Sequence, residues 1–468
     1  MRLLCLSNGH GEDAIALRIL QALQQQPNAP SLEALPIVGE GHAYTKARIP
    51  LIGSVKTMPS GGFIYMDGRQ LARDIGGGLL QLTLTQLKAI RAWARARETE
   101  DAPTPQRPNP PTPSPIPASP SSIILAVGDI VPLLFAWLSG LPYAFIGTAK
   151  SEYYLRDETG WLPRESWWSD RLERATGCVY HPWERWLMSR PNCKAVFPRD
   201  SITAKVLKQY SVPAFDLGNP MMDGIGGRLE GRHQGWEIED GESKGKPQKA
   251  EEDRGNPKFA QASNPVRATL TIALLPGSRP PEAYANWETI LLAVNGLIAK
   301  MGRPLKLLAA IAPGLDLKEL HQIISDFRWQ QVSENAYSVG WGETQATLVL
   351  AQDQFAQWLR QADLAISMAG TATEQFVGLG KPVITIPGKG PQFTPAFAEA
   401  QTRLLGPSVT LVAEPAQTAY AIQSLFGNPD RLQLIAENGG RRMGESGAAQ
   451  RIANCLMNVL EKGKLETN

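Results

Sequence analysis

Apolar residues along the chain fall into short continuous runs, rich in Leu, Ile, Val and Ala, separated by longer mixed stretches. Short apolar runs are typical of strands buried on both faces of a sheet. In the first half they predict strands near 2–7, 33–38, 122–128, 142–147, 176–180 and 193–197. In the second half they predict strands near 269–275, 305–311, 336–339, 363–366, 383–386 and 408–412.

The stretches between these strands predict helices, for example over 14–24, 287–301 and 351–361. Alternating strands and helices favour parallel sheets covered by helices on both faces. A chain of 468 residues also exceeds the usual size of one hydrophobic core. We therefore predict an α/β protein with two doubly wound, Rossmann-like domains. The cleft between the carboxyl ends of their strands is the default ligand site.

Two segments of low complexity interrupt this pattern. Residues 101–121 are rich in proline and predict an extended surface loop. Residues 224–266 combine Gly, Glu, Lys, Asp and Gln with few aliphatic side chains, which predicts a disordered insertion. The insertion separates an N-terminal domain, 1–218, from a C-terminal domain, 267–468, which would end in helices.

Charge and cysteine content narrow the classes of function. The net charge is +2, so the composition gives no sign of a nucleic-acid partner. The four cysteines lack the spacing of metal ligands and fit a reducing cytoplasm. The first apolar run is too short for a signal peptide, and no apolar run reaches the length that spans a bilayer.

Residues 366–390 predict a strand, a turn of small residues, a helix and a second strand. Ser367, Gly370 and Thr371 lack the bulk to keep a phosphate from the first amides of the helix, where the macrodipole favours negative charge. Glu374, about one turn into the helix, can accept hydrogen bonds from two ribose hydroxyls. An ordinary connection whose small residues allow close packing is the alternative.

A second turn, Pro276-Gly277-Ser278-Arg279, follows the apolar strand 269–275. Arg279 and the amides of Gly277 and Ser278 could neutralise the charge that develops on a leaving diphosphate. Taken alone, this sequence is a common surface turn. The two turns lie about 90 residues apart, which fits two loops that face one crevice of a parallel sheet.

The loop after the first strand carries two glycines, Gly9 and Gly11, that let the backbone approach a ligand. Asn8 precedes them, and Glu12 falls in the first helical turn, where a carboxylate is stabilising. The loop lacks the third glycine of a dinucleotide fingerprint, so we assign no nicotinamide site. His10 is either a turn histidine bonded to nearby backbone or a catalytic group on the acceptor side.

A single carboxylate, Asp129, ends the apolar strand 122–128. Burial would raise its pKa toward the range of a general base acting on an acceptor hydroxyl. Capping of the helix that begins near Val131 explains the same position equally well. Lys150 ends the next strand, beside hydroxyl and aromatic side chains that could line an acceptor pocket.

These loops resemble the lipid-A-disaccharide synthase family, and more closely the proteins described as lipid-A-disaccharide-synthase-related. The family's Leu-Pro-Gly-Ser-Arg turn is matched by 275–279, and its Ser-Gly-Thr-Ala-Thr-Glu element by 369–374 with one small insertion. The acidic first loop, Asp129 and the Gly-x-Pro segment at 218–223 match more loosely. The resemblance covers nearly the whole chain apart from the two low-complexity segments.

The resemblance implies a GT-B glycosyltransferase that inverts the sugar carbon and uses no metal or cofactor. The C-terminal domain would bind a UDP-sugar, and the N-terminal domain would bind the acceptor. The implied donor-binding residues are Gly277, Ser278, Arg279, Gly370, Thr371, Thr373, Glu374 and Gln375, with Gln392 as a weaker candidate. The implied acceptor side comprises Asn8, Gly9, Gly11, Glu12 and Lys150, with Asp129 and His10 as catalytic residues.

The glycine-histidine pair of the first loop is closer to transferases that act on diacylglycerol or on lipid-linked peptidoglycan precursors. All these relatives imply a lipid or glycolipid acceptor and a cytoplasmic protein at the inner face of a membrane. The donor sugar would be of the N-acetylglucosamine or acylated glucosamine type. Helix 79–97 has an apolar flank and a basic end, which fits either an interfacial helix or an ordinary packed helix.

Two other functions fit the same fold. A UDP-N-acetylglucosamine 2-epimerase would need more acid and base residues in the cleft than the sequence identifies. A nucleotide-sugar-binding protein without catalysis would be consistent with the loosely matched first loop. The sequence does not fix the oligomeric state.

Overall fold

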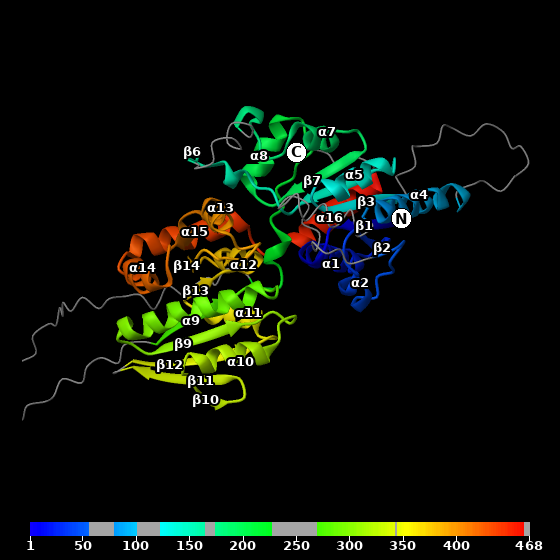
Figure 1. The fold of residues 1–468 in the computed structure, drawn as a ribbon. Coiled ribbons are helices and arrows are strands. Elements are labelled where there is room, and N and C mark those ends of the chain that lie inside the picture. The colour runs from blue at the N-terminus through cyan, green and yellow to red at the C-terminus, as the bar shows by residue number, and fades with distance from the viewer. Residues whose placement is uncertain (56–78, 101–121, 164–173, 227–268, 342–343, 463–468) are drawn as a thin grey trace, which may run out of the picture.

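The computed structural model describes residues 1–55, 79–100, 122–163, 174–226, 269–341 and 344–462. These residues form two domains, each a mainly parallel sheet with helices on both faces (Figure 1). The predicted α/β class with two doubly wound domains is confirmed. The proline-rich segment 101–121 and residues 227–266 of the insertion lie outside the described residues.

The N-terminal sheet has the strand order β2-β1-β3-β4-β7, and every pairing is parallel. Its strands are β1 (Arg2–Ser7), β2 (Ser31–Pro36), β3 (Ser122–Gly128), β4 (Tyr143–Gly147) and β7 (Cys193–Pro198). One core cluster packs α1 (His10–Gln24) on one face. Another packs α4 (Leu79–Glu100), α5 (Ile130–Leu138) and α7 (Pro182–Met188) on the other face. The short helices α2 (His42–Lys46) and α8 (Ser201–Gln209) complete this part.

The strand predicted at 176–180 does not form, because residue 176 is helical and residues 177–180 make a turn and bends. The amide of Val179 donates a hydrogen bond of 2.7 Å to the buried carboxylate of Glu152 instead of pairing with a strand. Glu152 begins the short helix η1 (Glu152–Tyr154), which follows β4. A buried acid thus replaces the sheet partner that the apolar run suggested.

The C-terminal sheet has the order β10-β11-β12-β9-β8-β13-β14-β15. Its central strands are β9 (Leu305–Ala310), β8 (Leu270–Leu275), β13 (Leu364–Ser367) and β14 (Val383–Thr385), with β15 (Val409–Leu411) at one edge. At the other edge, β10 (Gln330–Ser333), β11 (Ala336–Trp341) and β12 (Thr344–Ala351) pair antiparallel to one another. Strands β10 and β12 were not predicted from the sequence.

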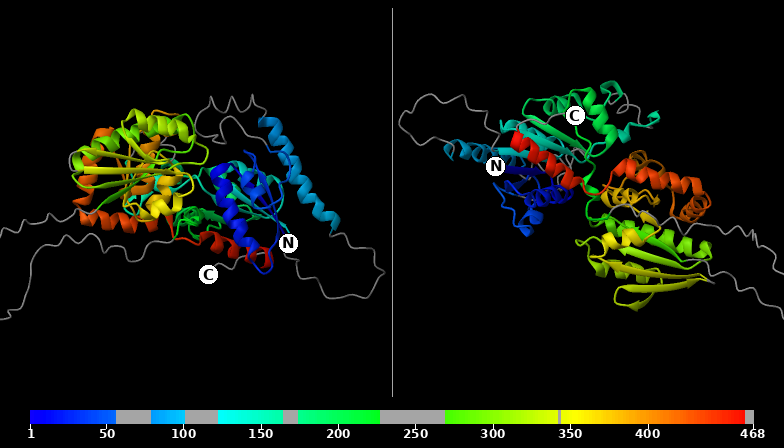
Figure 2. Two further views of the ribbon diagram at one scale, coloured as in Figure 1. Left: turned by 90° about the horizontal axis from the view of Figure 1, so that it is seen from below. Right: turned by 180° about the vertical axis from the view of Figure 1, so that it is seen from behind.

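Helices α9 (Glu282–Met301), α10 (Leu317–Asp326), α11 (Phe355–Gln361), α12 (Thr371–Gly378), α13 (Pro395–Leu405), α14 (Thr418–Phe426) and α15 (Pro429–Met443) cover this sheet. The last helix, α16 (Ala448–Lys462), crosses back and packs against α1 of the first domain (Figure 2). Gln26 and Asn454 share a hydrogen bond of 2.8 Å at this contact. The final helix of the segment expected to form the C-terminal domain, 267–468, therefore packs on the N-terminal domain.

Helix α4 packs Leu82, Ile90 and Trp93 into the core of the first domain. Its apolar side is thus used for packing, as the packed-helix alternative expects. Within the described part of the chain, no helix combines the length and the apolar character needed to cross a bilayer. All four cysteines are buried thiols.

Candidate functional site

The two turns predicted to bind the donor lie side by side. They follow β8 and β13, which are neighbouring parallel strands, and the amide of Met368 donates to the carbonyl of Leu275 at 2.9 Å. The side-chain amide of Asn286, on α9, donates to the carbonyl oxygens of Pro276 at 3.0 Å and Met368 at 3.4 Å. Asn286 therefore clamps the two turns together, a role that the sequence analysis did not assign.

The first of these turns depends on a glycine. Gly277 has φ +101°, and a Cβ there would come within 3.4 Å of the Met368 carbonyl oxygen. Ser278 is exposed and Arg279 is half-buried. Burial lowers the pKa of Arg279, whereas the carboxylates of Glu12 and Glu282 raise it. Glu12 belongs to the first domain, so Arg279 lies within electrostatic range of that domain.

The second turn leads into α12. Gly370 precedes the helix without a side-chain cap, and a Cβ there would meet only Phe397, at 3.6 Å. Thr371 is exposed. The first amides of α12 are therefore not blocked by a side chain, which is the arrangement that suits an anion.

Two of the expected donor contacts are turned inward. Thr373 is fully buried, and its hydroxyl donates to the carbonyl of Ala369 at 2.6 Å. The side-chain amide of Gln375 donates to the carbonyl of Met221 at 2.8 Å, in η2 (Pro220–Met222) between the domains. Thr373 and Gln375 therefore stabilise the turn and the linker, and the donor contacts expected of them stay predictions. Both side chains are buried in the protein interior.

The neighbouring loop, which carries Gln392, is held by Glu282 at the start of α9. The Glu282 carboxylate accepts hydrogen bonds from the backbone amides of Phe393 at 2.6 Å and Gln392 at 3.2 Å. These bonds use the backbone of Gln392 and not its side chain, so the donor contact expected of that side chain stays a prediction.

Glu374 makes an ion pair with a residue of the other domain. Nη2 of Arg199, directly after β7, lies 2.8 Å from Oε2 of Glu374. The side chain of Arg199 is only 4% exposed to solvent, and that of Glu374 is 11% exposed. The sequence analysis did not identify Arg199, and the ribose contact of Glu374 remains a prediction.

On the other wall, the loop after β1 is anchored by Asp13. Ser7 donates to Asp13 at 2.5 Å, and Tyr44 donates to Ser7 at 2.7 Å. This network holds Asp13 inside the domain, while the carboxylate of Glu12 interacts electrostatically with Arg279 across the cleft. Helix α1 begins at His10, earlier than predicted. The side chain of His10 lies outside the described residues.

Glu12 lies where the loops after β1 and β3 meet. Burial raises its pKa, and Thr148 and Arg279 oppose this effect; the Thr148 hydroxyl lies 3.4 Å from its carboxylate. Gly128 has φ +130°, and a Cβ there would lie 3.1 Å from Cβ of Asn8 and 3.3 Å from Cγ of Glu12. Only glycine permits this close approach. Asn8 is buried, and its Oδ1 has no hydrogen-bond partner among the described residues.

Asp129 caps a helix, as one of its two predicted roles requires, and its role as a general base stays a prediction. Its Oδ1 accepts a hydrogen bond of 2.9 Å from the amide of Val131 and so caps α5. Burial, together with the nearby charges of Glu12 and Glu184, raises the pKa of Asp129 to about 6. The hydrogen bond from Val131 and the charge of Lys150 act in the opposite direction and lower it. A carboxylate with such a pKa suits general base catalysis near neutral pH.

Comparison with known proteins identifies the architecture. No protein-family model and no curated protein sequence matches the chain. Its structure is similar to that of Staphylococcus aureus MnaA with UDP (TM-score 0.51, 14% identity, 100% of both chains covered). It is also similar to MurG from Acinetobacter baumannii (TM-score 0.51, 13% identity, covering 98% of this chain and 99% of that one). The chain has a GT-B fold.

A third structure with the same fold is a candidate UDP-N-acetylglucosamine 2-epimerase from Listeria monocytogenes (TM-score 0.52, 13% identity, covering 98% of this chain and 97% of that one). Identities this low establish the GT-B fold alone. In this chain, the residues described above come from strand ends of both sheets, as a site in the cleft of a GT-B fold requires.

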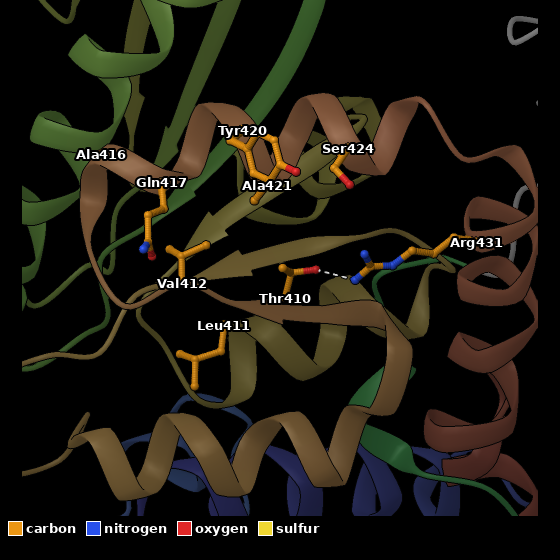
Figure 3. A pocket seen from close by; sticks show the side chains of 9 residues that line it. All are labelled: Thr410, Leu411, Val412, Ala416, Gln417, Tyr420, Ala421, Ser424 and Arg431. Carbon is orange, nitrogen blue, oxygen red and sulfur yellow. Dashed lines mark hydrogen bonds between the residues drawn. The ribbon is translucent and has the colours of Figure 1, made fainter.

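A separate pocket lies at the far edge of the second sheet, between β15 and α14 (Figure 3). Arg431 donates to the hydroxyl of Thr410 at 2.8 Å on its wall. None of the candidate site residues lines this pocket. Its lining residues are Thr410, Leu411, Val412, Ala416, Gln417, Tyr420, Ala421, Ser424 and Arg431.

Proposed function

We propose that this protein is an inverting glycosyltransferase that moves a sugar from a UDP-sugar to a lipid-linked acceptor, as the lipid-A-disaccharide synthases do. The observation that carries the proposal is that Arg279 of the second domain and Glu12 of the first lie near enough for each charge to affect the pKa of the other. This proximity brings a cation suited to a diphosphate opposite the acidic loops suited to an acceptor hydroxyl. The protein would work in the cytoplasm, at the inner face of a membrane.

The donor would lie against the C-terminal domain. The amides of Gly277 and Ser278, the guanidinium of Arg279 and the uncapped first turn of α12 would bind its diphosphate. Glu374 would accept hydrogen bonds from the ribose hydroxyls. These groups supply positive charge directly, so the proposed reaction needs no metal.

The acceptor would be activated by Asp129. Its carboxylate would take the proton of the acceptor hydroxyl while the hydroxyl oxygen attacks the anomeric carbon. The bond from that carbon to the phosphate oxygen breaks on the opposite side, UDP leaves, and the configuration at the carbon is inverted. Arg279 would stabilise the charge that develops on the departing diphosphate.

The similarity to MnaA in complex with UDP supports a UDP-containing ligand, and the similarity to MurG is consistent with a transferase. One observation favours a second function, a UDP-N-acetylglucosamine 2-epimerase. Besides Glu12 and Lys150, the charge of Glu184 acts on Asp129, and Glu184 is an acidic group that the sequence analysis did not identify. The structure from Listeria monocytogenes is consistent with this alternative.

Two successive measurements distinguish the transferase, the epimerase and the binding protein. Purified protein is first tested for UDP binding by calorimetry, then incubated with radiolabelled UDP-N-acetylglucosamine and total membrane lipid. A transferase gives labelled lipid, whereas an epimerase gives the 2-epimer of the nucleotide sugar without added lipid. UDP binding with neither product would indicate a binding protein. Absence of UDP binding would overturn the proposal.

Asp129→Asn tests the base, because asparagine can still cap α5. The variant should bind UDP like the wild type and lose turnover by about 100-fold or more. Retained turnover would remove Asp129 from the mechanism.

A further inference from the structure

Arg199 belongs to the first domain, yet its guanidinium contacts the second. Its Nη2 donates to Oε2 of Glu374, on α12, at 2.8 Å. Its Nη1 donates to the carbonyl of Thr148, in the loop after β4, at 3.2 Å. The second bond fixes the guanidinium to the first domain, so the position of the Glu374 carboxylate is set from across the interface.

Stability alone does not account for this pair. Both side chains are almost fully removed from water, and a buried ion pair is seldom more stabilising than well-packed apolar side chains. Nε of Arg199 is also buried and has no partner within the described part of the chain, which is unfavourable. Burial acts to lower the pKa of Arg199, but the charge of Glu374 raises it overall, so the guanidinium stays protonated.

The ion pair with Arg199 does not use all the acceptor capacity of the Glu374 carboxylate. Arg199 bonds Oε2, while each carboxylate oxygen can accept more than one hydrogen bond. A glutamate that is already held in one rotamer loses less conformational freedom when it binds a ligand than one that moves freely. Holding the carboxylate in place therefore increases its affinity for two adjacent hydroxyls.

We propose that Arg199 is a positioning residue that holds the Glu374 carboxylate for the ribose of the nucleotide. This inference rests on the proposed binding of UDP. In this proposal Arg199 acts on the ribose only through Glu374, to which its guanidinium is bonded. Substitution of Arg199 should lower the affinity for ligands that have ribose hydroxyls and leave unchanged the affinity for ligands that lack them.

Arg403 offers a matched control. It is also an arginine that joins the domains, because its guanidinium donates to the carbonyl of Tyr154. Its carboxylate partner is Glu399, at 2.7 Å on the same helix, and not Glu374. Loss of Arg403 should loosen the interface without changing the rotamer of Glu374.

The test compares UDP with 2′,3′-dideoxy-UDP by calorimetry, on the full chain. Wild type should prefer UDP by about tenfold or more. Arg199→Gln should lose most of that preference while its affinity for the dideoxy ligand stays within about twofold of wild type. Arg403→Gln should keep the preference. Arg199→Lys, which retains the charge, should restore part of it and serves if the Gln variant does not fold.

A double variant links the two residues. Arg199→Gln combined with Glu374→Gln should lose no more ribose preference than Glu374→Gln alone. Arg199 variants that keep the full preference, or that weaken both ligands equally, would overturn the inference while leaving UDP binding intact. If the wild type fails to bind UDP, the proposed function and this inference both fall.

Discussion

Nζ of Lys150 lies 2.5 Å from Oε2 of Glu184, and both charges act on Asp129. Lys150 lowers the pKa of Asp129 and Glu184 raises it, while burial is the largest effect and brings the value to about 6. The ion pair therefore places two opposing charges beside the proposed base. Removing either partner should leave the other charge uncompensated.

Lys150→Met should raise the pKa of Asp129 above about 6, because the charge of Glu184 then acts unopposed. A general base works only when it is deprotonated, so the acid limb of the pH dependence of kcat/KM should move to higher pH. The measurement is a pH–rate profile of the sugar transfer. Lys194→Met is the control, because Lys194 bonds the carbonyl of Pro191 at 2.9 Å instead of Glu184. An unmoved limb in the Lys150 variant would contradict the prediction.

Asp129 should also lower stability at neutral pH. Its pKa is about 6 in the folded protein, against an ordinary value of 3.8, so between these pH values the folded state binds the proton more tightly than the unfolded chain does. Stability therefore falls as pH rises from about 4 to about 6, and the loss is complete above that range. Asp129→Asn removes this effect while keeping the cap.

The Asn variant should thus be more stable than wild type at pH 8, by up to about 3 kcal/mol, and gain little at pH 4. Chemical denaturation at the two pH values measures the difference. Equal effects of the substitution at both pH values would show that Asp129 is not protonated more readily in the folded state.

The two turns of the proposed donor side could be predicted because each is encoded locally. A strand, a glycine turn and Arg279 are contiguous in sequence, and Gly370 directly precedes α12. The same local view did not reveal that Thr373 and Gln375, which flank Glu374, bond the carbonyls of Ala369 and Met221. Whether each side chain faces the cleft depends on what packs against α12, and Met221 of the linker is one such partner.

Contacts between distant segments could not be read from one sequence. Arg199 lies in a Phe-Pro-Arg-Asp segment with no feature that distinguishes it from a surface residue, and its partner is 175 positions away. Asn286 looks like an ordinary polar position of α9 until the two turns are seen around it. The return of α16 to α1 likewise depends on tertiary packing rather than on any local signal.

Arg279→Ala should weaken UDP binding by about 1.5 to 3 kcal/mol, the usual contribution of a hydrogen bond to a charged group. Calorimetry measures the change in Kd. The matched control is Arg431→Ala, in the pocket beside β15, where the arginine bonds Thr410 and not a candidate site residue (Figure 3). Equal affinity of wild type and the Arg279 variant for UDP would remove this turn from the donor site.

Gly128→Ala should impair both folding and activity. The residue has φ +130°, and the new Cβ would press on Asn8 at 3.1 Å and Glu12 at 3.3 Å. Backbone strain of this kind costs of order 1–3 kcal/mol, and displacement of Glu12 would disturb the contact with Arg279. We expect a lower free energy of unfolding and a reduced kcat/KM.

Gly140→Ala distinguishes the effect of backbone strain from the effect of crowding at Glu12. Gly140 has φ +77°, and no atom lies within 4 Å of the position that its Cβ would take, so only backbone strain is added. This control should lose about 1 kcal/mol of stability and keep wild-type kcat/KM. If both alanine variants lose activity in proportion to their stability, crowding at Glu12 has no part in the effect. If only Gly128→Ala loses activity, the close approach of the loops after β1 and β3 is needed for the reaction.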